Sequence, residues 1–213
     1  ESNFFLKERK FIEATPLYID LVKEFPDNFH LQFNLALCYL NTDKYNECID
    51  LLDNINKKFP LNAEVNYLKG VCFESLKKLD EALEFYKKAL KIDKKHQNSW
   101  LRCAIIHRKI KDFDKALELF TYVYNNFSHP LGVATDIAIT LFEKGELEQS
   151  EKILKEIISK KPDNHLAKQF LALIYHKTPG KKALALKIEK EISGKIDFTY
   201  KGSNLNLEIT EDG

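Results

Sequence analysis

The sequence is poor in residues that interrupt a fold and has no excess of either charge. Its 213 residues include only seven glycines and six prolines, which leaves little room for long linkers or low-complexity tracts. No apolar run approaches the ~20 residues that a membrane-spanning helix needs. The 33 basic residues face 32 acidic ones, for a formal charge of +1. We therefore expect no nucleic-acid partner and no direct membrane insertion.

Methionine is absent and cysteine is scarce. Because no methionine precedes Glu1, we expect further residues before it in the natural protein, and a removed signal peptide stays open. The four cysteines show neither a Cys-x-x-Cys spacing nor histidines at zinc-ligand spacing. They are Cys38, Cys48, Cys72 and Cys103. They fall on apolar helix faces, so free and buried thiols are expected, which favours a reducing, cytoplasmic location.

Signatures of catalysis are missing as well. The sequence has no glycine-rich phosphate loop, no HExxH, no GxSxG and no cysteine–histidine arrangement. No two of the six histidines lie four residues apart on one helix face, as a helical metal site would need. We expect no enzyme activity, no cofactor and no metal.

A repeat of 34 residues is the main feature that is present. The segment Asp-Glu-Ala-Leu-Glu-Phe-Tyr (80–86) aligns at that shift with Asp-Lys-Ala-Leu-Glu-Leu-Phe (114–120). A partial repeat begins at Glu1, and the residues that take position 1 of the later repeats are Phe29, Ala63, Gln97, Leu131 and His165. Such self-similarity indicates stacked units that cannot bury their apolar faces alone.

Several columns of the repeat explain how helices would pack. Position 8 is always small: Ser2, Ala36, Gly70, Ala104, Ala138 and Ala172. Position 20 is small too: Ala14, Cys48, Ala82, Ala116 and Ser150. Small residues on both helices of a pair permit a close antiparallel crossing, while large residues at positions 11, 17 and 24 fill the space between pairs.

Helix ends follow the same register. Pro26, Pro60 and Pro162 stand at position 32, and Asp27-Asn28, Asn62 and Asp163-Asn164 follow as N-cap candidates. Pro16 falls early in the second helix of the first repeat, where we expect a mild distortion rather than a break.

The C-terminal part departs from the pattern. Thr178-Pro179-Gly180 predicts a shortened turn, followed by a cap helix from about Lys182 to Ser193 with Leu184, Ile188 and Ile192 on its apolar stripe. In residues 194–213, apolar and polar side chains alternate on both sides of Lys201-Gly202-Ser203-Asn204. This alternation predicts a β-hairpin-like tail or the start of a further domain.

These columns resemble the tetratricopeptide repeat, whose motif has small residues at 8 and 20, aromatics at 11 and 24, and proline at 32. The resemblance covers residues 1–193. It implies an all-α fold, a right-handed superhelical solenoid of about six helix-turn-helix repeats, that acts as a protein-binding scaffold.

In proteins that this chain resembles, positions 2, 5, 9, 12 and 13 of each first helix line an inner groove. The candidate groove residues are Phe33, Leu37, Tyr67, Val71, Glu74, Leu101, Ile105, Arg108, Thr135, Ile139 and Phe142. Some family members bind carboxylate-ended peptides through a clamp of basic residues and asparagines. Here Asn3 and Asn34 match two clamp positions, but Glu64 and Leu68 occupy the two basic ones, so such a ligand is not favoured.

Three functions are consistent with the sequence. The first is an adaptor whose partly apolar groove binds a peptide or helix, because contiguous apolar surface marks interaction sites. The second is a structural subunit that stacks or self-associates through its solenoid ends or its tail. The third, an RNA-binding repeat protein, is disfavoured because Glu64, Glu74 and Glu143 stand at groove positions.

Overall fold

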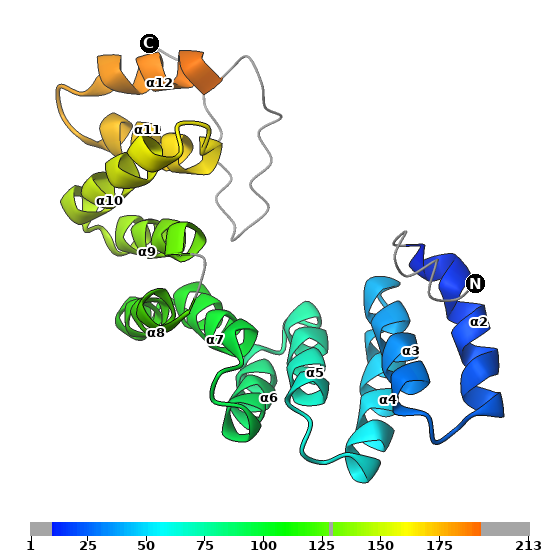
Figure 1. The fold of residues 1–213 in the computed structure, drawn as a ribbon. Helices are drawn as coiled ribbons and strands as arrows, with labels where there is room; N and C mark the ends of the chain where they lie inside the picture. Colours follow the sequence, from blue (N-terminus) through cyan, green and yellow to red (C-terminus); the bar gives the residue numbers. More distant parts are fainter. Residues whose placement is uncertain (1–9, 128–129, 193–213) are drawn as a thin grey trace. The chain divides into compact units, whose positions relative to one another are not determined.

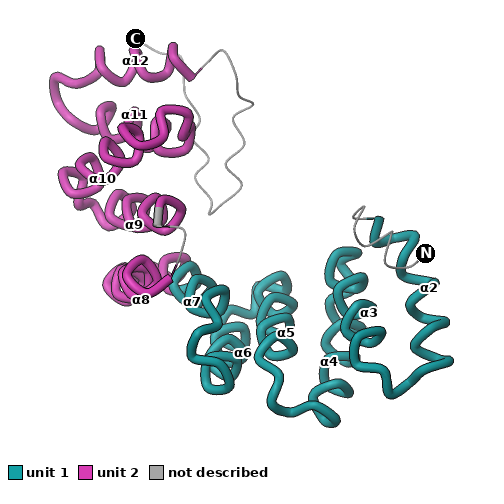
Figure 2. Tube along the Cα trace, viewed as in Figure 1, with its two compact units in different colours: residues 1–106 teal, residues 107–213 magenta. Residues whose placement is uncertain are grey.

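The computed structural model describes residues 10–127 and 130–192, and its regular elements over those ranges are all α-helices. The chain groups into two compact units, residues 1–106 and 107–213 (Figure 2). The unit boundary falls within one helix, and each unit is described by itself. The predicted division into 1–193 and 194–213 stays a prediction, and the predicted hairpin at 194–213 lies outside the described residues.

Helices that follow one another in the chain pack as neighbours from α2 to α6 and from α8 to α12 (Figure 1). Their bounds in the first unit are α2 Phe11–Glu24, α3 Phe29–Asn41, α4 Tyr45–Lys58, α5 Ala63–Ser75, α6 Leu79–Ile92 and the start of α7 Gln97–Lys109. In the second unit they are α8 Phe113–Asn126, α9 Pro130–Lys144, α10 Leu147–Lys160, α11 His165–Lys177 and α12 Lys182–Ile192. None of these helices is long and apolar enough to cross a membrane.

The helix bounds confirm the predicted register. Helices α3, α5, α7 and α11 begin at position 1 of their repeats, and α9 begins one residue earlier. Helices α2, α4, α6, α8 and α10 all begin at position 17. Helix α2 runs through Pro16 without a break, as expected for a proline in the first turns, and Thr15 donates its hydroxyl to the Phe11 carbonyl oxygen at 2.7 Å.

The predicted N-caps are also confirmed. The side-chain oxygens of Asn28, Asn62 and Asn164 each accept a hydrogen bond from the backbone N–H three residues later, at 3.2, 3.1 and 3.0 Å. Each bond satisfies a donor that the first turn of a helix leaves without a partner. The asparagines therefore fix where the first helix of a pair begins.

A left-handed residue closes the turn inside the four helix pairs from α3–α4 to α9–α10. It stands at position 15, where Asp43, Lys77, Lys111 and Gly145 have φ values of 60°, 62°, 64° and 95°. In each of these turns the N–H of position 16 donates to the carbonyl oxygen of position 11 at 2.9 Å, which ends the first helix as a Schellman motif does. Only one of the four residues is glycine, so composition alone did not reveal this shared conformation.

The small and large columns form the core of the first unit. Ala14, Ala36, Cys48 and Ala82 are completely buried, as are Tyr18, Leu52 and Tyr86 at position 24. The Cys48 thiol donates to the Ala36 carbonyl oxygen at 3.2 Å, which shows how closely positions 20 and 8 approach. The absence of bulk in these two columns is therefore what lets the paired helices cross.

The second unit repeats this packing. Ala138, Leu154 and Ala167 are fully buried within a cluster that also includes Phe142, Phe170 and Tyr175. Ser150, at position 20, donates its hydroxyl to the Ala138 carbonyl oxygen at 2.6 Å. The same two columns thus meet in both units, although their residue types differ.

The end of the second unit corrects two predictions. The turn between α11 and α12 is longer than in the other pairs rather than shorter, because its left-handed residue, Gly180, stands at position 16. The added residue rotates the last helix. Its buried stripe begins at Ala185, which is 0% exposed, and not at Leu184, which is 48% exposed.

All four cysteines are free and buried, as the sequence predicts. Burial raises the pKa of the Cys38 thiol and of the Cys103 thiol to about 11, so both stay protonated at neutral pH. Cys48 and Cys72 lie next to each other, and the hydrogen bond with the Cys72 thiol, followed by burial, raises the pKa of Cys48. A protonated, buried thiol packs as a small apolar group, which is the role these positions need.

Gly70 gives the sharpest test of this packing. A Cβ atom at Gly70 would lie 2.5 Å from Cε1 of Tyr86, whose ring is fully buried and whose hydroxyl donates to Glu74 at 2.8 Å. We expect Gly70→Ala to destabilise the first unit by ~1–3 kcal/mol, the usual cost of overpacking, despite the better helix propensity of alanine.

Gly132→Ala is the matched control, because a Cβ atom there meets nothing within 4 Å. Alanine at that helical position should raise stability by ~0.5–1 kcal/mol. Urea unfolding followed by circular dichroism measures both changes. Equal stability of the two variants would show that Gly70 is not packed against Tyr86 as described.

Candidate partner-binding surface

Six of the predicted groove residues form a partly exposed apolar surface in the first unit. We call this set the apolar stripe: Phe33 and Leu37 on α3, Tyr67 and Val71 on α5, and Leu101 and Ile105 on α7. All six are half-buried. On each helix the two members are four residues apart and so share a face. Phe33, Leu37 and Tyr67 pack against one buried cluster, which places α3 and α5 beside each other.

The corresponding residues of the second unit are placed differently. Thr135, Ile139 and Phe142 are only 5%, 1% and 5% exposed. The Phe142 ring packs edge-on against Phe170 of the next repeat, with centroids 5.4 Å apart. A partner cannot reach side chains that are this deeply buried, so we leave these three out of the proposed surface. Sequence position alone did not distinguish them. Ile139 and Phe142 belong to a buried cluster that also includes Phe170 of the following repeat.

Beside the stripe, a polar network links α5, α6 and α7. The Tyr86 hydroxyl donates to Oε2 of Glu74 at 2.8 Å, and Arg102 lies 3.6 Å from the same oxygen and bonds to the side chain of Tyr67. Glu74 is only 9% exposed, so these partners satisfy most of its charge. Burial, and then the charge of Glu74, raises the pKa of Tyr86 and keeps its hydroxyl protonated.

The second unit holds a related network with its charges reversed. Arg108 contacts Asp136 at 3.2 Å and Glu143 at 3.9 Å, and its guanidinium lies 5.6 Å from the centre of the Phe120 ring. The Arg108 side chain is 11% exposed. Burial raises the pKa of Asp136, although the neighbouring Arg108 acts to lower it. Arg108 therefore holds neighbouring elements together and is not presented to a partner.

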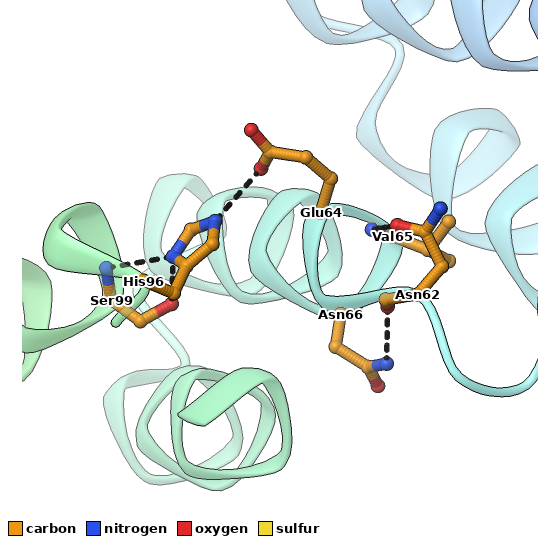
Figure 3. Close-up of polar contacts among 6 residues, drawn as sticks. All are labelled: Asn62, Glu64, Val65, Asn66, His96 and Ser99. Atoms are coloured by element: carbon orange, nitrogen blue, oxygen red, sulfur yellow. Dashed lines mark hydrogen bonds and ion pairs between the residues drawn. The ribbon is translucent and has the colours of Figure 1, made fainter. Parts of the chain in front are cut away.

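A histidine caps α7 at the position where α3, α5 and α11 have asparagine (Figure 3). Nδ1 of His96 accepts the backbone N–H of Ser99 at 3.2 Å, a donor shared with the His96 carbonyl oxygen at 3.1 Å. Because Nδ1 is an acceptor here, the imidazole proton is on Nε2, and this nitrogen donates to Oε2 of Glu64 at 3.1 Å. The cap thus ties the start of α7 to the face of α5.

Ser99, His96 and Glu64 contact one another in the same sequence as the nucleophile, base and acid of a catalytic triad. Oγ of Ser99 lies 2.9 Å from Nδ1 of His96. Ser99 is 0% exposed, however, so its hydroxyl cannot reach a substrate. A structural cap accounts for all three contacts, and the geometry supports no hydrolytic role.

Other features of the described residues lie away from the stripe. One hollow of about 550 Å³ lies between α2 and the turn that joins α3 to α4, and another of about 470 Å³ lies among α8, α9 and α10. Neither is lined by a predicted groove residue. Within residues 10–127 and 130–192, no three histidine, cysteine or carboxylate side chains gather as metal ligands would.

Comparison with family models decides the classification. One tetratricopeptide repeat model matches residues 5–72 and 107–174, and another matches residues 63–96. The chain belongs to the tetratricopeptide repeat family. The resemblance noted in the sequence is thereby confirmed, and the family consists in general of interaction modules. No curated protein matches the sequence.

Solved structures agree on the fold. A tetratricopeptide repeat protein from Parabacteroides merdae ATCC 43184 is 18% identical, with 93% of this chain and 78% of that chain covered and a TM-score of 0.79. MamA, residues 41 to the end, from Desulfovibrio magneticus RS-1 is 17% identical, with coverages of 79% and 94% and a TM-score of 0.70. YrrB, a tetratricopeptide repeat protein with an unusual peptide-binding site, is 17% identical, with coverages of 78% and 86% and a TM-score of 0.61.

The N-cap of α7 gives a direct test of this part of the tetratricopeptide repeats. We expect His96→Ala to lower the free energy of unfolding by ~1 kcal/mol, the usual effect of removing an N-cap. His96→Asn should recover most of that loss, because asparagine caps α3, α5 and α11 from the same place. Urea unfolding measures both. If the alanine variant is as stable as the wild type, His96 is not a cap.

Proposed function

We propose that this chain is a non-catalytic scaffold that binds a peptide or helix of a partner protein along the apolar stripe. The observation that carries the proposal is the partial exposure of six apolar side chains on the first helices of three consecutive repeats. A side chain kept half-exposed on a packed helix leaves apolar area that a partner can cover, which is favourable by ~25 cal/mol per Å² before ordering costs.

The arrangement around the stripe supports this reading. Tyr67 bonds to Arg102, and its ring lies 5.7 Å from that of Tyr86 and 5.1 Å from that of His96. These contacts hold the central aromatic side chain in place before a partner arrives. A surface that is already ordered loses less entropy on binding. YrrB is described as having a peptide-binding site, and we extend only the general idea of peptide binding to this chain.

A structural role in a larger assembly is the second candidate. It is favoured by the last helix, on which Leu184 and Leu186 are 48% and 47% exposed. Large apolar side chains at the end of a repeat array are places where another chain can stack. In that case the chain would self-associate or join a neighbour through its end, and the stripe would be incidental.

The two candidates are separated by changing the stripe without disturbing the core. Peptides selected from a random library on the wild-type chain serve as the probe. We expect the double variant Val71→Ser with Leu101→Ser to weaken their binding at least about tenfold, because burying each aliphatic side chain contributes ~1.5–3 kcal/mol. Fluorescence anisotropy measures the dissociation constants, and circular dichroism checks that helicity is retained.

Leu61→Ser is the matched control. Leu61 is 84% exposed and stands in the turn before α5, so its loss removes exposed apolar area away from the stripe. It should leave peptide binding within about twofold of the wild type. Equal losses in the control and in the double variant would contradict the proposal. Association of the wild type that Leu184→Ser abolishes, with no effect of the stripe variant, would favour the structural role instead.

A further inference from the structure

We propose that the segment bound on the apolar stripe carries a basic side chain, lysine or arginine, that pairs with Glu64. The inference rests on the proposed function and specifies the chemistry of its partner. It follows from where Glu64 stands, from how exposed its carboxylate is, and from the charge balance of the groups around it.

Glu64 stands on the edge of the stripe. It lies three residues before Tyr67 and seven before Val71, so all three share one face of α5. Its side chain is 52% exposed. Figure 3 shows it extending from α5 toward the ring of His96, whereas Asn66 points away from it on the other side of the helix. A peptide that covers Tyr67 and Val71 therefore passes beside this carboxylate.

Within residues 10–106, the contact that Glu64 makes is with a neutral hydrogen-bond donor, His96. Nδ1 of His96 accepts the N–H of Ser99, so the ring carries its proton on Nε2 and gives Glu64 a hydrogen bond without a counter-charge. Among residues 10–106 of the described chain, no lysine or arginine forms an ion pair with Glu64. The other carboxylate beside the stripe, Glu74, is different because Arg102 lies next to it.

Covering the stripe changes the surroundings of Glu64. A bound segment removes water from its edge, and leaving a polar group buried without a partner costs ~1–3 kcal/mol, more for a charged group. A lysine or arginine on the segment replaces the lost water with a charge-assisted bond, whereas an acidic residue adds repulsion. Charge at this one position thus selects a basic amphipathic segment and disfavours an acidic one.

A pair of matched probes tests the inference. One is a fluorescein-labelled helical peptide of leucine, alanine and lysine, and the other has every lysine replaced by glutamate. We expect the lysine peptide to bind the wild-type chain at least about tenfold more tightly. Glu64→Gln keeps an oxygen that accepts from His96 but removes the charge, and should reduce this preference at least about fivefold.

Glu81→Gln provides the matched control, because it removes the same charge from an exposed residue on α6, the second helix of the same pair. It should change the preference by less than about twofold. A preference that is unaltered in Glu64→Gln, or altered equally in Glu81→Gln, would overturn the inference and leave the stripe as a binding surface. Failure of both peptides to bind, or binding that is indifferent to Val71→Ser with Leu101→Ser, would overturn the proposed function and this inference with it.

Discussion

The contact between position 12 of one repeat and position 6 of the next governs how neighbouring helix pairs meet. Glu74 faces Arg102 beside Tyr86, and Arg108 faces Asp136 beside Phe120. At the following junction the same two positions hold the aromatic pair of Phe142 and Phe170. The two members of each pair attract each other, whereas position 12 of one pair, if it faced position 6 of another, would bring together two like charges or a charge and an apolar ring. A repeat that slipped to the wrong neighbour would therefore bury an unpaired charge, which is strongly unfavourable.

This contact also decides which side chains a partner can reach. Where the pair is Glu74 with Arg102, the guanidinium neutralises the buried carboxylate beside the stripe. The neighbouring Tyr67 and Leu101 stay half-exposed. Where the pair is Phe142 with Phe170, the two rings cover each other and join the core. Equivalent positions in one sequence motif thus become surface in the first unit and interior in the second. Binding capacity follows from the junction and not from the motif alone.

The sequence predicted the periodic part of this structure and missed the parts that depend on a neighbour. Helix starts, caps and the buried columns follow from local chemistry such as the amide of Asn62 or the missing side chain of Gly70. The burial of Ile139 and Phe142 depends on a cluster shared with Phe170 of the next repeat, and the residue type of Lys77 does not predict its left-handed backbone. The last turn was predicted too short because Ala183 stands one place before position 20 and is small, as that position requires, whereas the small residue that is buried is Ala185.

The charge reversal between the two junctions offers the most direct test of this account. The double variant Glu74→Arg with Arg102→Glu copies the polarity of Arg108 and Asp136 into the earlier junction. In a double-mutant cycle measured by urea unfolding, each single variant should be strongly destabilised, and the swap should recover ~1–3 kcal/mol beyond additivity, as contacting pairs do. Additive effects, within ~0.5 kcal/mol, would show that the two positions do not hold the repeats together.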